Sequence, residues 1–131
     1  MASELRVNTL KDASGNNSVA TSVVHSGTAK AWVYFTGVTS TSARDSYNVA
    51  SLTDTATGKT TVNYTSNMAN TTYTGSMFSN AHSGGTAADT FNNDYTGGFG
   101  SKATGSVRQV AYASTTLDAD ANDVIIFGDL A

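Results

Sequence analysis

The stretch that most limits the fold is residues 28–37, TAKAWVYFTG, which holds the only tryptophan and the densest group of aromatic residues. Aromatic, β-branched and small residues favour strands. Strand side chains alternate between two faces, so one face carries four apolar residues and the other carries two aromatics and a lysine. The first set is Ala29, Ala31, Val33 and Phe35, and the second is Lys30, Trp32 and Tyr34.

Both faces of this predicted strand therefore carry large apolar surface. A strand in a two-layer sandwich needs only one buried face. The face with Trp32 and Tyr34 needs cover from another layer or from another copy of the chain. We expect a core strand in an oligomeric protein, with Trp32, Tyr34 and Phe35 supplying the core and the subunit contact.

The composition favours a small β domain with a thin core. The chain has 131 residues, which fits one domain, and only 39% of them are hydrophobic and 13% charged. It has 12 glycines and no proline, and Thr, Ser and Asn make up much of the rest, which is typical of short strands and turns. A chain with so little to bury gains stability by sharing a core between subunits.

Charge and cysteine content argue against several classes of function. The net charge is −3 and no basic patch is present, so we expect no nucleic-acid partner. With no cysteine, the chain has neither disulfides nor a thiolate zinc site. Residues 1–6 lack the apolar core of a signal peptide, and no apolar run is long enough to span a membrane, so we expect no membrane partner.

The hydrophobic pattern predicts about seven to nine short strands and no convincing helix longer than ten residues. We expect an all-β, jelly-roll-like β-sandwich over residues 28–131, preceded by an extended N-terminal arm with short strands over residues 1–27. The expected strands are 5–10, 18–24, 28–37, 43–49, 60–65, 72–78, 106–113 and 123–128.

Turn signals and the last strand add detail to this prediction. Residues 12–17, DASGNN, predict a turn, and Gly58 predicts the turn of a hairpin that ends in the strand 60–65. The strand 123–128 is apolar on both faces, so we expect it in the middle of a sheet.

The least regular region, residues 79–100, is a predicted loop with three aromatic residues. Phe91, Tyr95 and Phe99 either face outward, where they could stack on sugars or contact a host receptor, or fold inward to close the loop. Asp89 and Asp94 lie in the same loop, but an acid pair of this kind is a weak sign of a glycosidase.

Residues 118–123, DADAND, resemble the start of a calcium loop. Asp123 occupies the position where such a loop needs glycine, and no glutamate follows at the twelfth position. A solvated turn and weak calcium binding both remain open. His25 and His82 have no nucleophile motif nearby, so we expect no enzyme, no catalytic residue and no cofactor.

Two parts of the sequence resemble bacteriophage proteins. Residues 4–17, ELRVNTLKDASGNN, resemble the leader that precedes small β domains in tail-fibre proteins of marine podoviruses. Residues 26–37 and 43–54 resemble the domain itself, and the likeness continues through Gly58, 61–64 and 70–73 with an echo in 124–128. Residues 77–104 depart from it.

The resemblance implies a non-enzymatic virion protein that is made in the cytoplasm of a bacterial host and located on the particle surface. It implies a homotrimer that contacts other virion proteins, decorating or stabilising the capsid or forming a short fibre or knob. Leu5, Val7 and Leu10 would form an arm that exchanges with a neighbour or docks to the particle. The alternative is a tail-fibre tip domain that binds a host receptor or glycan through Phe91, Tyr95 and Phe99.

Overall fold

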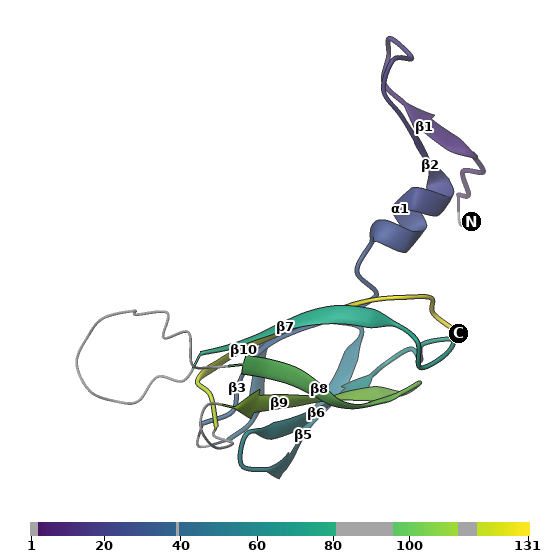
Figure 1. Ribbon diagram of the computed structural model, residues 1–131. Helices are drawn as coiled ribbons and strands as arrows, with labels where there is room; N and C mark the ends of the chain where they lie inside the picture. Colours follow the sequence, from purple (N-terminus) through teal and green to yellow (C-terminus); the bar gives the residue numbers. More distant parts are fainter. Residues whose placement is uncertain (1–2, 39, 81–95, 113–117) are drawn as a thin grey trace, which may run out of the picture.

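The computed structural model describes residues 3–38, 40–80, 96–112 and 118–131, and these form two antiparallel sheets and an N-terminal arm (Figure 1). The first sheet has the order β4 (Ser42–Tyr47), β3 (Ala31–Thr36), β10 (Ala121–Phe127) and β7 (Thr74–Asn80). The second has the order β5 (Val49–Ala56), β6 (Lys59–Tyr64), β9 (Ser106–Tyr112) and β8 (Thr96–Ala103). The all-β prediction is confirmed.

The strand order shows how the last strand is used and how the sheets are connected. β10 pairs with β3 on one side and β7 on the other, so the prediction of a central C-terminal strand is confirmed. Consecutive strands pair as hairpins at β3–β4, β5–β6 and β8–β9. Jelly rolls are built from two Greek keys, and this hairpin-rich order does not confirm that part of the prediction.

The hydrophobic core lies between the sheets and is built largely from alternate residues of their central strands. Along β3 the burial alternates as predicted, with Ala31, Val33 and Phe35 buried. The neighbouring strand β10, the strands of the other sheet and the connections add Val62, Tyr64, Met68, Tyr73, Val107, Val124 and Ile126. This alternation is what a sheet with one face on the core requires.

A buried polar cluster crosses the core between the sheets. Gln109 on β9 donates from Nε2 to Ser79 Oγ on β7 (2.6 Å) and to Asn122 Oδ1 on β10 (3.0 Å). Ser79 Oγ also donates to Asn122 Oδ1 (2.8 Å), and Asn122 Nδ2 donates to the carbonyl of Ala119 (2.9 Å). All three side chains are buried, so these hydrogen bonds satisfy polar groups that solvent does not reach.

Two turns were predicted correctly and one strand was not. Gly58 (φ 67°) turns the chain between β5 and β6, and Gly15 (φ 72°) turns it within the arm. The predicted single strand 43–49 is wrong, because Asn48 takes a left-handed conformation (φ 55°) that ends β4 and starts β5 in the other sheet. Its amide holds the corner, donating to the carbonyls of Lys30 (2.9 Å) and Ser66 (3.1 Å).

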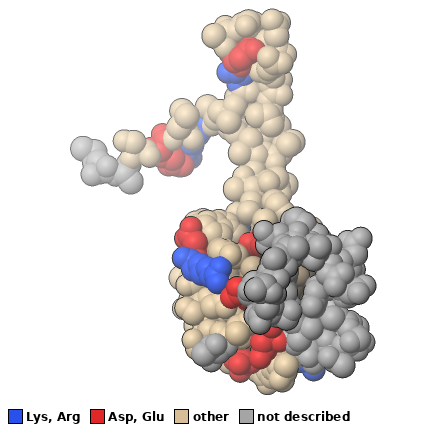
Figure 2. All heavy atoms as spheres, turned by 90° about the vertical axis from the view of Figure 1, so that its left-hand side faces the viewer, with Lys and Arg blue, Asp and Glu red and all other residues tan. Residues whose placement is uncertain are grey.

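The N-terminal arm stands away from the sandwich (Figures 1 and 2) and is more mixed than predicted. It contains β1 (Thr9–Lys11), β2 (Ser18–Ala20) and a short helix, α1 (Thr21–Gly27). The predicted strands 5–10 and 18–24 are therefore correct only at Thr9, Leu10 and Ser18–Ala20. Within the described part of the chain, no helix has the length and apolar content to cross a membrane.

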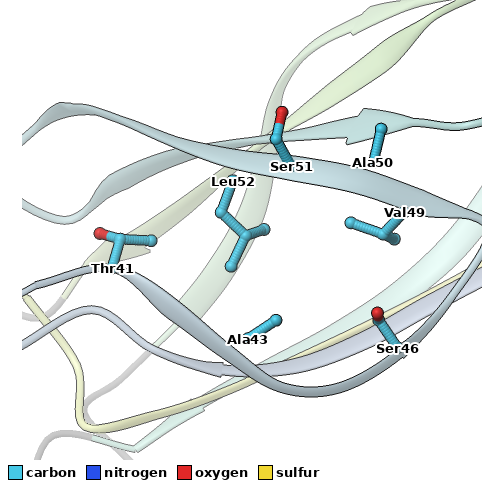
Figure 3. A pocket seen from close by; sticks show the side chains of 7 residues that line it. All are labelled: Thr41, Ala43, Ser46, Val49, Ala50, Ser51 and Leu52. Carbon is cyan, nitrogen blue, oxygen red and sulfur yellow. The ribbon is translucent and has the colours of Figure 1, made fainter.

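The two long sides of the sandwich differ. On the β7 and β8 side, the ring of Phe99 on β8 crosses to Gly75 on β7, where an added Cβ would lie 3.1 Å from its Cζ. On the other side, β4 and β5 separate beyond Asn48, and a groove opens between them (Figure 3). We call these the closed seam and the open seam.

Candidate functional site

The outer face of the first sheet carries an apolar row across three strands. Trp32 on β3 lies between Tyr47 on β4 and Ile125 on β10 in the strand register. Tyr47 is 53% exposed and Ile125 is 40% exposed, while Trp32 between them is half-buried. Interfaces are enriched in aromatic residues at their centres, so we call this face the candidate contact face.

A polar row runs beside it on the same face. Tyr34 lies between Asp45 and Asp123 in the register. Arg44 donates from Nη1 to the Tyr34 hydroxyl (2.6 Å), its guanidinium lies 5.0 Å from the ring centre, and its Nη2 is 3.2 Å from Asp120 Oδ1. The Asp123 carboxylate has no hydrogen bond or ion pair with any described residue, and burial raises its pKa.

Replacing this carboxylate tests whether it destabilises the isolated chain. A raised pKa means that the native state binds more protons than the unfolded state, so stability falls as pH rises from about 4 through the folded pKa. Asp123→Asn should therefore raise the Tm at pH 7, by a few degrees at most because solvent screens the group. Thermal melts from pH 3 to 7 would show a weaker decline for the variant.

Asp54→Asn provides the control, since it removes one negative charge from an exposed position on β5. Its melting profile should follow that of the parent chain. A lower Tm for Asp123→Asn at pH 7 would contradict the interpretation and indicate that this carboxylate stabilises the native state.

The structure divides the predicted subunit-contact residues between two faces. Trp32 and Tyr34 lie on the candidate contact face, as the alternation predicted. Phe35 points the other way and is completely buried in the core. Phe35 therefore has no surface to offer to a second subunit, and its part of the predicted contact is corrected to a core role.

The open seam contains a groove of about 290 Å³, shown with its lining in Figure 3. Ala43 and Ser46 line it from β4, and Val49 and Leu52 line it from β5. The remaining lining residues are Thr41, Ala50 and Ser51. The lining has no charged side chain, so the groove is suited to small apolar groups with a few hydroxyls at its rim.

The arm exposes the apolar residues that the sequence singled out. Leu5 is 80% exposed, and Val7 and Leu10 are also exposed. Val19, Val23 and Val24 add to this surface, and α1 has no buried residue. These valines were not predicted to be surface residues, although their position in an arm rather than in the sandwich was the available signal.

The predicted binding loop is only partly within the described residues. Phe91 and Tyr95 lie outside them, as do Asp89, Asp94 and His82. Phe99 is not on an exposed loop, because it belongs to β8 and packs half-buried against the core. Lys102 Nζ lies 5.4 Å from its ring centre and donates to the carbonyl of Tyr73 (2.8 Å). The strands β7 and β8 thus shorten the predicted loop at both ends.

The acidic residues near β10 have separate partners. Asp118 Oδ1 accepts a hydrogen bond from the backbone N–H of Gly58 (2.7 Å). Asp120 accepts from Arg44, and from Thr36 Oγ1 (3.3 Å). Among the residues that the structure describes, no group of three or more His, Cys, Asp or Glu side chains is placed to hold a metal ion. The arrangement gives the calcium hypothesis no support there.

Comparison with known proteins adds no assignment. No protein-family model, no curated protein and no solved structure matches the chain.

Proposed function

We propose that the protein is a non-enzymatic structural module of a bacteriophage particle, assembled as a homotrimer on the particle surface. The main support for an oligomer is that two apolar surfaces, the candidate contact face and the arm, are exposed among the described residues. The location on a phage particle and the trimeric state are proposed from the resemblance of residues 4–73 to podovirus tail-fibre domains. Capsid decoration, a short fibre and a knob are the forms it would take.

The composition of the candidate contact face supports a protein partner. The row contains a tryptophan, a tyrosine and an isoleucine, and beside it Arg44 bonds the hydroxyl of Tyr34. Tryptophan, tyrosine and arginine are the residue types that contribute most to binding energy at interfaces. A second copy that covers Trp32, Tyr47 and Ile125 would add apolar burial to a chain that has little of it. Such sharing is the thermodynamic reason to expect an oligomer.

The arm supports the same proposal by a separate argument. A two-stranded hairpin is marginally stable alone, and a seven-residue helix is far below the length at which helices persist in water. Few contacts tie α1 to the sandwich; His25 Nδ1 lies 3.7 Å from Asp129 Oδ1, and its carbonyl accepts a hydrogen bond from Lys30 Nζ. An arm of this kind gains order when it docks to a neighbour or to the particle.

Solution mass tests the oligomer. Sedimentation should give a mass three times that of the 13.5 kDa chain. Trp32→Asp should shift it to the monomer, because a charge at the centre of a buried apolar contact is costly to desolvate. Thr61→Asp, on the outer side of β6, is the matched control and should remain trimeric. A parent chain that stays monomeric at all concentrations would contradict the proposal.

Imaging of intact particles tests the location. Density for this chain at capsid threefold positions would identify a decoration protein, and density on the tail would identify a fibre or knob. Purified particles that lack the chain altogether would contradict the viral role, even if the chain proved trimeric in solution.

A further inference from the structure

We propose that the N-terminal segment 4–8 of one copy adds as a strand to the free edge of β4 in a neighbouring copy, inserting Leu5 and Val7 into the open seam. This inference rests on the proposed oligomer and specifies how its subunits are linked. The receiving site is one side of the sandwich, and the occupant is a second copy of this chain.

The receiving edge, six residues with a bulge at Arg44, is unpaired within the described structure. β4 pairs with β3 along one side, and no other described strand pairs with it. All of its residues are exposed. An edge of this kind presents backbone N–H and C=O groups that accept an added strand.

The groove beside this edge matches aliphatic side chains. The residues of β4 that face inward, Ala43 and Ser46, are small, which leaves space between them and Val49 and Leu52 of β5 (Figure 3). The closed seam shows what fills the equivalent position, because there the large ring of Phe99 packs against Gly75. In the open seam Val49 and Leu52 come from β5, but β4 contributes only the small Ala43 and Ser46, so room remains for an added apolar side chain.

The donor segment has the complementary features. Residues 4–8 precede β1 and belong to no strand or helix. Leu5 and Val7 are exposed and lie two residues apart, so both point to the same side of an extended chain. Arg6 and Asn8 then point to the opposite side, toward solvent.

The charges fix a register. If Leu5 lies opposite Ser46 in an antiparallel pair, Arg6 lies opposite Asp45, and the bulge at Arg44 brings Val7 opposite Ala43. Among the described residues, the Asp45 carboxylate accepts a hydrogen bond only from the N–H of Ser46 (2.8 Å). Opposite charges across a strand pair are favourable. Arg6 is bonded to Glu4 in the isolated chain (Nε–Oε1, 2.9 Å), but both side chains are well exposed and such a pair contributes little.

The arm presents this segment to a neighbour rather than to its own sandwich. Thr21 Oγ1 donates to the carbonyls of Val7 (3.1 Å) and Asn8 (3.2 Å), which ties the segment to the base of the arm. The arm extends away from the body in two perpendicular views (Figures 1 and 2). Each of three copies could then donate its segment to the next with no rearrangement of any sandwich.

Cysteine cross-linking between full-length chains tests the contact, and the chain has no native cysteine to interfere. Chains carrying Leu5→Cys are mixed with chains carrying Ser46→Cys, then oxidised and separated without reductant. We expect a cross-linked pair of chains at least tenfold more abundant than in the control mixture of Leu5→Cys with Thr53→Cys. Thr53 is exposed on β5 and pairs with Thr61, outside the groove.

A charge swap gives a second measurement that is independent of disulfide formation. Arg6→Asp should weaken assembly at least fivefold, and the double variant Arg6→Asp with Asp45→Arg should restore it. A trimer without the preferred cross-link, or a double variant that assembles no better than Arg6→Asp, would overturn the strand addition and leave the oligomer intact. A monomeric parent chain would overturn both proposals.

Discussion

Replacing Gly75 by alanine is expected to destabilise the protein by about 3 kcal/mol and to lower its Tm by about 10 °C. A Cβ at this position would lie 2.3 Å from the backbone oxygen of Ile125 and 2.8 Å from Ile126 Cδ1. It would also meet the ring of Phe99 at 3.1 Å. Because the nearest atom belongs to the backbone of a central strand, relief requires β7 and β10 to move apart. Chemical denaturation and thermal melts measure the loss.

Gly98→Ala is the matched control, because Gly98 also lies in an edge strand of the closed seam but has open space where its Cβ would point. It should be neutral or slightly stabilising, since alanine loses less conformational entropy than glycine on folding. Equal effects at Gly75 and Gly98 would show that close approach of the strands is not the reason for glycine at position 75.

The sequence predicted the parts of the fold that depend on alternation. Ala31, Val33 and Phe35 are buried and Trp32 and Tyr34 are not, as a period of two requires. The same reasoning placed β10 in the centre of a sheet, because a strand that is apolar on both faces needs neighbours on each side. Turn chemistry located Gly58 and Gly15 for the equally local reason that glycine tolerates positive φ.

The errors arose where tertiary context decides the structure. Residues 43–49 alternate like one strand, but the left-handed Asn48, bonded to Lys30 and Ser66, turns the chain there into the second sheet. Phe99 looked like a loop residue because glycines surround it, yet it lies on β8 and its ring crosses the closed seam to Gly75. The groove was not predictable either, since it depends on how two edge strands from different sheets diverge.

The buried polar cluster was also invisible to sequence reasoning, because Ser79, Gln109 and Asn122 lie on separate strands and resemble ordinary surface residues. It joins β9 of the second sheet to β7 and β10 of the first. Each bond is made in the absence of water, so the loss of one member leaves its partners unsatisfied. The cluster thereby favours one alignment of the sheets over slipped alternatives.

Asn122→Ala should accordingly lower the free energy of unfolding by about 3 kcal/mol, since it leaves Gln109 Nε2, Ser79 Oγ and the Ala119 carbonyl short of a partner. Asn63→Ala is the control. The Asn63 amide bonds Ser51 and Thr53 at the surface, where water replaces the lost bonds, so the substitution should cost less than about 1 kcal/mol.

The double variant Asn122→Ala with Gln109→Ala should be less destabilised than the sum of the single variants, because the second truncation removes a group that the first has left without a partner. Additive losses in urea denaturation would mean that the three side chains act separately and that the cluster does not act as one unit in aligning the sheets.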